Sequence, residues 1–193
     1  HTAPTARRIR WHRAIGEALE TLTGTLDESA CAEIAHHFAQ AAPGGGDAEK
    51  AITYTKRAAD RAMESLAYEE AASHYDRALQ LLDLQGPELP RRCSLLLDWG
   101  EAQHRAGNSP RAREIFQRAA ELAKTLQAPT ELARAALGFG GELLIPGRID
   151  TELVHLLENA LAAQPTDEST LRAQLLGRLA MELYHAPAPQ QRE

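Results

Sequence analysis

Cysteine is scarce in this sequence of 193 residues, and so are aromatic side chains. With only Cys31 and Cys93, the chain can build neither a disulfide framework nor a four-cysteine zinc site. We therefore expect a reducing compartment and a cytoplasmic location. Aromatic residues make up 5% of the chain, while alanine is abundant. This bias favours closely packed helices over a β-sheet, so the composition predicts an all-α protein.

Long apolar runs and an excess of positive charge are also missing. No apolar run approaches the roughly 20 residues that a membrane-spanning helix needs, and no signal-peptide core follows the N-terminus. The formal net charge is -6, whereas non-specific binding to nucleic acid requires a basic field. We therefore expect no membrane span and no direct contact with nucleic acid.

A repeat of 41 residues is present instead. Four columns keep the size class of their side chains at this spacing: Ala59, Gly100 and Gly141; Tyr75, Phe116 and Leu157; Ala78, Ala119 and Ala160; Leu81, Leu122 and Ala163. Small residues let helices approach closely, and large ones fill the space between them. The repeat therefore indicates a packing unit that is used several times.

Each period has the apolar spacing of two helices joined by a short turn. We expect Gly107 to end one helix in a left-handed conformation, Ser109 to cap the next helix and Pro110 to occupy its first turn. Extended along the chain, this pattern predicts about nine helices, at residues 7–22, 28–42, 47–64, 67–84, 89–106, 110–126, 131–145, 150–163 and 168–185.

The order of Gly100, Gly107, Ala112, Phe116 and Ala119 resembles the tetratricopeptide signature, lengthened to 41 residues. This resemblance implies a right-handed α-solenoid of tetratricopeptide-like helix pairs that forms one domain over residues 1–193. Other repeats depart from the signature, since Leu66 stands where Gly107 stands.

A second resemblance covers nearly the whole chain. Residues 7–19, 32–38, 58–62, 66–71 and 181–184 are similar to the helical region of large ATP-binding LuxR-type transcriptional regulators. The resemblance implies a fragment of a multidomain protein. It would act as a non-enzymatic interaction or sensor domain between an ATPase and a DNA-binding domain. The alternative is a free-standing tetratricopeptide scaffold for protein assembly.

Catalytic and cofactor motifs are not found in the sequence. Residues 44–50 contain glycines and Lys50 but not the order of a phosphate-binding loop, and no zinc-protease motif or nucleophile elbow occurs. Adjacent His36 and His37 point about 100° apart on a helix and cannot readily share one ion. His74 falls in a packing column and His155 in a solvent column. We expect no enzyme activity, no metal and no cofactor in this fragment.

The arginine-rich start of the chain has two interpretations. Arg7, Arg8, Arg10 and Arg13 around Trp11 could form a nucleic-acid patch. We favour an amphipathic helix whose apolar face packs on the solenoid or on a preceding domain, through Trp11, Ile15, Ala18, Leu19 and Leu22.

The tetratricopeptide resemblance places binding residues on a concave face lined by the first helix of each pair. These residues are Lys56, Asp60, Met63, Leu97, Glu101, His104, Glu142 and Ile145. The carboxylates form a column that suits a basic partner, and Met63, Leu97 and Ile145 would add apolar contact. The alternative is that the carboxylates are solvated and paired within their own helix, as Glu101 could be with Arg105. A protein, peptide or small-molecule effector would bind here.

The last helix is strongly apolar, with leucines at Leu171, Leu175, Leu176, Leu179 and Leu183. Solenoids normally end in a polar cap. The sequence therefore predicts self-association through the C-terminal helix.

Overall fold

The computed structural model describes residues 5–23, 30–44, 47–141, 149–165 and 169–184. Every regular element in these ranges is helical, and no strand occurs among them, so the all-α prediction is confirmed. The elements are α1 (Thr5–Thr23), α2 (Cys31–Ala41), a short 3-10 helix η2 (Ala42–Gly44), α3 (Ala48–Glu64), α4 (Tyr68–Asp83), α5 (Leu89–Arg105), α6 (Ser109–Thr125), α7 (Pro129–Gly140), α8 (Thr151–Ala163) and α9 (Thr170–Tyr184). No described helix combines the length and the apolar character that crossing a membrane requires.

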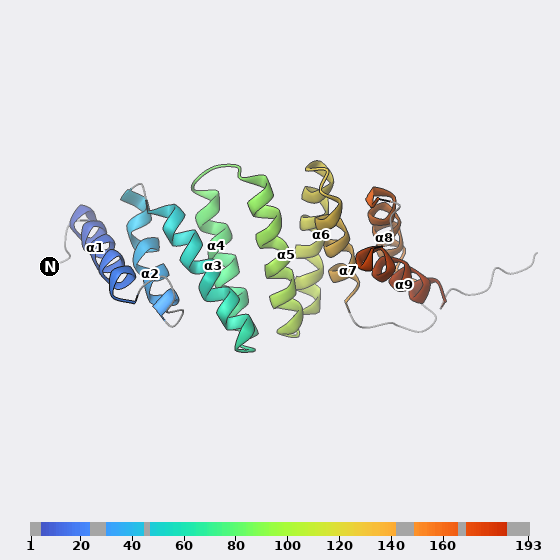
Figure 1. Cartoon of the computed structure of the whole chain (residues 1–193), viewed down its shortest axis with the longest axis horizontal. Coiled ribbons are helices and arrows are strands. Elements are labelled where there is room, and N and C mark those ends of the chain that lie inside the picture. Colours follow the sequence, from blue (N-terminus) through green and yellow to red (C-terminus); the bar gives the residue numbers. More distant parts are fainter. Residues whose placement is uncertain (1–4, 24–29, 45–46, 142–148, 166–168, 185–193) are drawn as a thin grey trace, which may run out of the picture.

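The helices lie in a row from α1 at one end to α9 at the other (Figure 1). Each described helix packs mainly on its neighbours in sequence. In the C-terminal half the first helices of successive pairs also meet, α5 with α7 and α7 with α9. Contacts between successive hairpins are typical of a helical repeat protein. The right-handed sense of the solenoid stays a prediction.

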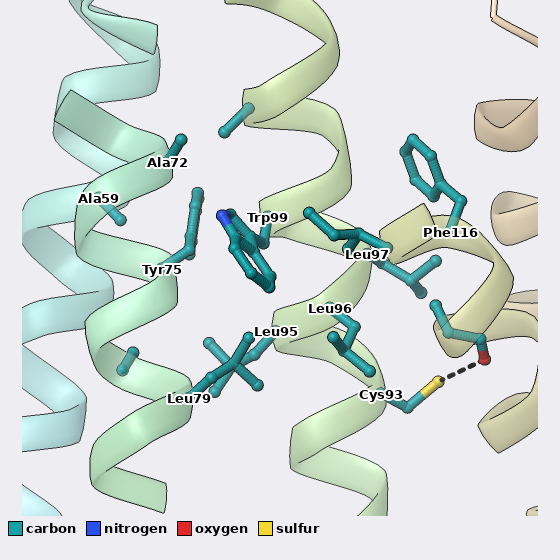
Figure 2. Packing of buried hydrophobic residues seen from close by; sticks show 14 of the residues in the cluster. Ala59, Ala72, Tyr75, Leu79, Cys93, Leu95, Leu96, Leu97, Trp99 and Phe116 are labelled. Carbon is teal, nitrogen blue, oxygen red and sulfur yellow. Dashed lines mark hydrogen bonds between the residues drawn. The ribbon is translucent and has the colours of Figure 1, made fainter. Parts of the chain in front are cut away.

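The columns of the repeat lie in the core. Ala78, Ala119 and Ala160 have no exposed surface, and the bulky column of Tyr75, Phe116 and Leu157 is at most 3% exposed. Figure 2 shows the packing between α4 and α5, where Tyr75 faces Trp99. In the fourth column, burial is lost at the C-terminal repeat, because Ala163 is exposed.

Phe116 occupies a space that two glycines leave open. A Cβ atom on Gly100 of α5 would lie 2.8 Å from the Phe116 ring, and one on Gly138 of α7 would lie 2.3 Å from it. The same arrangement recurs in the first hairpin, where a Cβ atom on Gly16 would lie 3.2 Å from Phe38. The 41-residue spacing did not reveal this additional pair. The close approach of α5 and α7 to α6 thus depends on missing side chains.

Three turns between helices share one backbone pattern. The second residue after the helix has a positive φ at Leu66 (60°), Gly107 (80°) and Gln127 (53°). The next amide bonds back to the carbonyl five residues earlier, for example Asn108 to Gln103 at 2.9 Å. This is the Schellman motif, and Gly107 ends its helix as predicted. Ser109 does not cap α6: Asn108 precedes the helix, without a side-chain capping bond.

α7 is shorter than the predicted helix over residues 131–145. It ends at Gly140, and Gly141 has a φ of 56° and a ψ of -164°, which no helix continues through. The prediction that Gly141 lies at a helix crossing is therefore wrong. Gly138, one turn earlier, makes the close approach instead.

The terminal helices expose part of their apolar surface. On α1, Trp11, Ile15 and Leu22 are 50%, 43% and 82% exposed, so the prediction that they pack on the solenoid is wrong for these residues. Leu19 packs against the core as predicted, and Gly16 packs against Phe38. On α9, Leu175 is buried and Leu176 is exposed. Packing against a preceding domain and self-association both stay predictions.

Candidate functional site

A groove of about 1300 Å³ lies where the ends of several helices meet. It is bordered by the last turn of α5, the first turns of α6 and α8, the last turn of α7, and α9. Tyr68, the first residue of α4, closes one side, and Phe139 supplies a second aromatic ring. The hairpin turns of the repeat place these helix ends together, so the groove is a product of the stacking.

The structure separates the predicted binding residues. Glu101 and His104 line the groove. Leu97 is only 1% exposed and belongs to the hydrophobic core, so the prediction that it offers apolar contact to a partner is wrong. Lys56, Asp60 and Met63 lie on α3, outside the groove, and Glu142 and Ile145 lie outside the described residues.

On α3, Asp60 belongs to a small polar network. The Lys56 Nζ lies 2.8 Å from its Oδ2, and the Tyr75 hydroxyl donates to its Oδ1 at 2.7 Å. Asp98 of α5 lies 3.7 Å from the same Lys56 Nζ. Burial, together with the hydrogen bond to Asp60, raises the pKa of Tyr75 well above its usual value. The carboxylate of Asp60 therefore faces charged and hydroxyl donors of its own chain.

Glu101 is likewise paired within its helix. The Arg105 Nε donates to its Oε1 at 2.6 Å, as the ion-pair alternative describes. The Arg105 guanidinium also lies over the Tyr68 ring, 5.8 Å from its centroid. This edge of the groove therefore presents a carboxylate and a guanidinium together rather than a row of bare carboxylates.

Arg113 of α6 also lines the groove. Its guanidinium lies 3.6 Å from the centroid of the Phe139 ring, 2.6 Å from Asp150 and 3.2 Å from Glu152. Asp150 also caps α8, since its Oδ1 accepts the backbone N–H of Leu153 at 3.1 Å. Burial alone would raise the pKa of Asp150, but the hydrogen bonds from Arg113 and Leu153 lower it overall. A negative charge at the α8 N-terminus also suits the helix dipole.

A buried ion pair on α9, formed by Arg178 and Glu182, lines the groove. Arg178 Nη2 donates to the carbonyl oxygen of Gly140 at 2.8 Å and lies 3.5 Å from the carboxylate of Glu182. Glu182 accepts the backbone N–H of Asp150 at 2.9 Å. Side-chain exposure is 12% for Arg178 and 6% for Glu182. We call these four residues the α9 joint; it ties the end of α7 to the start of α8.

Sequence reasoning missed Arg113, Arg178 and Glu182. The spacing of Arg178 and Glu182 is that of an ion pair within one helix, which was the available signal. Their partners on α7 and α8 are 32 to 38 residues away in sequence. No period of the repeat links them, so the joint could be found only in three dimensions.

His74 and His155 are exposed to the degree that their repeat columns predict. The side chain of His74, in the packing column, is 22% exposed, and that of His155, in the solvent column, is 77% exposed. Within the part of the chain that the structure describes, no group of three or more histidine, cysteine, aspartate or glutamate side chains is arranged to hold a metal ion. The groove itself combines paired charges with two aromatic rings. Such a lining suits the binding of a ligand by hydrogen bonds and ring contacts.

A comparison with models of known protein families gave no match to this chain, and a comparison with curated proteins gave no significant match either.

Proposed function

We propose that this chain is a non-enzymatic binding domain that holds a peptide or another effector in the groove between α5 and α9. The supporting observation is a groove of about 1300 Å³ lined by charged pairs and aromatic rings. Sites for specific ligands are concave and place a few polar groups among apolar ones. Two other depressions on the described surface are smaller, with volumes of about 340 and 410 Å³.

The lining favours a ligand that can both donate and accept hydrogen bonds. Glu152 and Arg113 are 56% and 35% exposed in their side chains, so part of their hydrogen-bonding capacity faces solvent. The ring of Tyr68 adds flat apolar surface. A peptide has amide donors, carbonyl acceptors and side chains that could use all three.

The groove also suits a sensor. Because residues of six helices border it, a ligand that prefers one spacing of the helix ends would shift the population of stack curvatures. In the LuxR-type regulators that the sequence resembles, such a shift would reach a neighbouring ATPase. We propose this setting on the resemblance alone. The gene sequence on both sides tests it: a phosphate-binding loop upstream and a helix-turn-helix downstream would support it, whereas stop codons at both ends would leave the free-standing scaffold.

Binding itself can be tested with a displayed library of random peptides. Peptides selected on the wild-type chain should bind Glu101→Lys at least about tenfold more weakly, a loss of about 1.4 kcal/mol. Glu121→Lys is the charge-matched control, since Glu121 is exposed on α6 away from the groove. Circular dichroism of each variant establishes that its helices are intact. A library that yields no binder, or binders equally tolerant of both changes, would refute the proposal.

A further inference from the structure

Three histidines meet where α1 packs on α2. The ring of His12 on α1 lies 5.1 Å from the ring of His37 and 5.9 Å from that of His36, centroid to centroid. His36 and His37 are 5.5 Å apart. The Nδ1 atoms of His12 and His37 approach to 3.0 Å, which is hydrogen-bond distance. The contact spans 25 residues of sequence and links the two helices directly.

This contact depends on the number of protons that the two rings carry. A nitrogen–nitrogen hydrogen bond needs one N–H and one lone pair, so at most one of the two facing nitrogens can hold a proton. When both rings are imidazolium, both Nδ1 atoms are donors and the rings repel each other. The pair is therefore compatible with zero or one net charge and incompatible with two.

The surroundings add further positive charge. The pKa of His12 is lowered, most of all by burial and then by electrostatic repulsion from His37, His36 and Arg8. On the other elements packed against this region, Asp47 at the start of α3 is held by Arg13 at 2.6 Å, and Lys50 of α3 is held by Glu20 at 2.6 Å. The acidic residue in the first turn of α2 is Glu33, which is exposed. Carboxylates ordinarily titrate near pH 4, so between pH 7.5 and 5.5 it is histidines that change charge.

We propose that the His12–His37 contact is a pH-sensitive link between two helices, which holds α1 on α2 above neutral pH and releases α1 in mild acid. The sign follows from linkage. A histidine whose pKa is lowered in the folded state contributes stability above its unfolded value of about 6.5, and this contribution is lost as the pH falls. Release of α1 would uncover Phe38, against which Gly16 packs.

Hydrogen–deuterium exchange of the α1 amides tests the proposal on the full chain. After correction for the pH dependence of intrinsic exchange, opening of α1 should rise at least about threefold from pH 7.5 to pH 5.5, because protonation of the second ring breaks the contact. Because α6 contains no histidine, the opening of its amides should be the same at both pH values.

Two substitutions assign the effect to the contact. His12→Asn removes the buried imidazole and should abolish the rise, whereas His37→Asn removes the contact but leaves His12 buried and should reduce the rise. Asparagine keeps an amide near the Nδ1 position and cannot become charged. His155→Asn is the matched control, since this histidine is exposed on α8 and should leave the rise intact. If one asparagine variant does not fold, the other still decides. Equal opening of wild-type α1 at both pH values, or a rise in a folded asparagine variant as large as in the wild type, would overturn the proposal.

Discussion

At the scale of single residues, the missing side chain of Gly138 sets how closely α7 can approach α6. A methyl group there would lie 2.3 Å from the Phe116 ring, well inside contact distance. Since Phe116 is 3% exposed, the ring has little room to move away. We expect Gly138→Ala to lower the free energy of unfolding by about 1 to 3 kcal/mol, measured by urea denaturation.

A matched glycine provides the control. Gly177 is exposed on α9, and a Cβ atom added there would meet nothing within 4 Å. Gly177→Ala should therefore stabilise the chain by up to about 1 kcal/mol through helix propensity. If both alanine variants are equally stable, the packing assigned to Phe116 is wrong.

Leu66 carries backbone strain at an exposed position. Its φ of 60° is left-handed, and the residue is 68% exposed, so little packing offsets the strain. We expect Leu66→Gly to raise the free energy of unfolding by about 0.5 to 1 kcal/mol, because glycine adopts this conformation without a Cβ clash. Thermal unfolding measures it. The opposite change, Gly107→Ala, should lower the free energy of unfolding. If both Leu66→Gly and Gly107→Ala lower it, this account is contradicted.

At the scale of helices and turns, the sequence predicted most of the fold because apolar spacing and turn residues agree. The prediction was wrong for the end of α7, because Leu143, Leu144 and Ile145 continue the apolar pattern past Gly141. The backbone conformation of Gly141, which the pattern does not contain, ends the helix.

The candidate site was only partly predictable. Glu101 and His104 line the groove, as repeat position suggests, whereas Leu97 does not, although it lies one turn before Glu101 on the same helix. Burial along one face of a helix depends on which neighbours cover it. The partners of Arg113 and Arg178 come from other hairpins and follow no period.

The α9 joint gives an element-scale prediction. Replacing the buried Arg178 by methionine leaves the Glu182 carboxylate without its cation, so Arg178→Met should cost about 3 to 5 kcal/mol. Adding Glu182→Gln should recover part of this loss, since a neutral amide oxygen can still accept the Asp150 N–H. Urea denaturation of both variants measures it. A double variant less stable than Arg178→Met would contradict this account.

At the scale of the whole molecule, a row of hairpins with neighbour contacts should open from its ends. The two cysteines can report this. Cys31 begins α2 near one end of the row, and Cys93 lies in α5 near the middle (Figure 1). Both are buried thiols that form no disulfide, and burial raises the pKa of Cys93, which disfavours the reactive thiolate.

We therefore expect both thiols to react slowly with a disulfide reagent in the native chain, and Cys31 to become reactive at a lower urea concentration than Cys93. Measured on the variants Cys93→Ala and Cys31→Ala, the two urea profiles should be displaced from each other. Coincident profiles would mean that the row unfolds as one cooperative unit.

The shared geometry of the turns at Leu66, Gly107 and Gln127 has a consequence for how such repeats are recognised. Only one of the three positions carries glycine, the residue that marks such corners in a sequence, yet all three corners have the same main-chain hydrogen bonds. Neighbouring hairpins can therefore hold a corner that its own residue does not favour. Repeats in a chain of this kind are counted more safely by main-chain bonding than by residue identity.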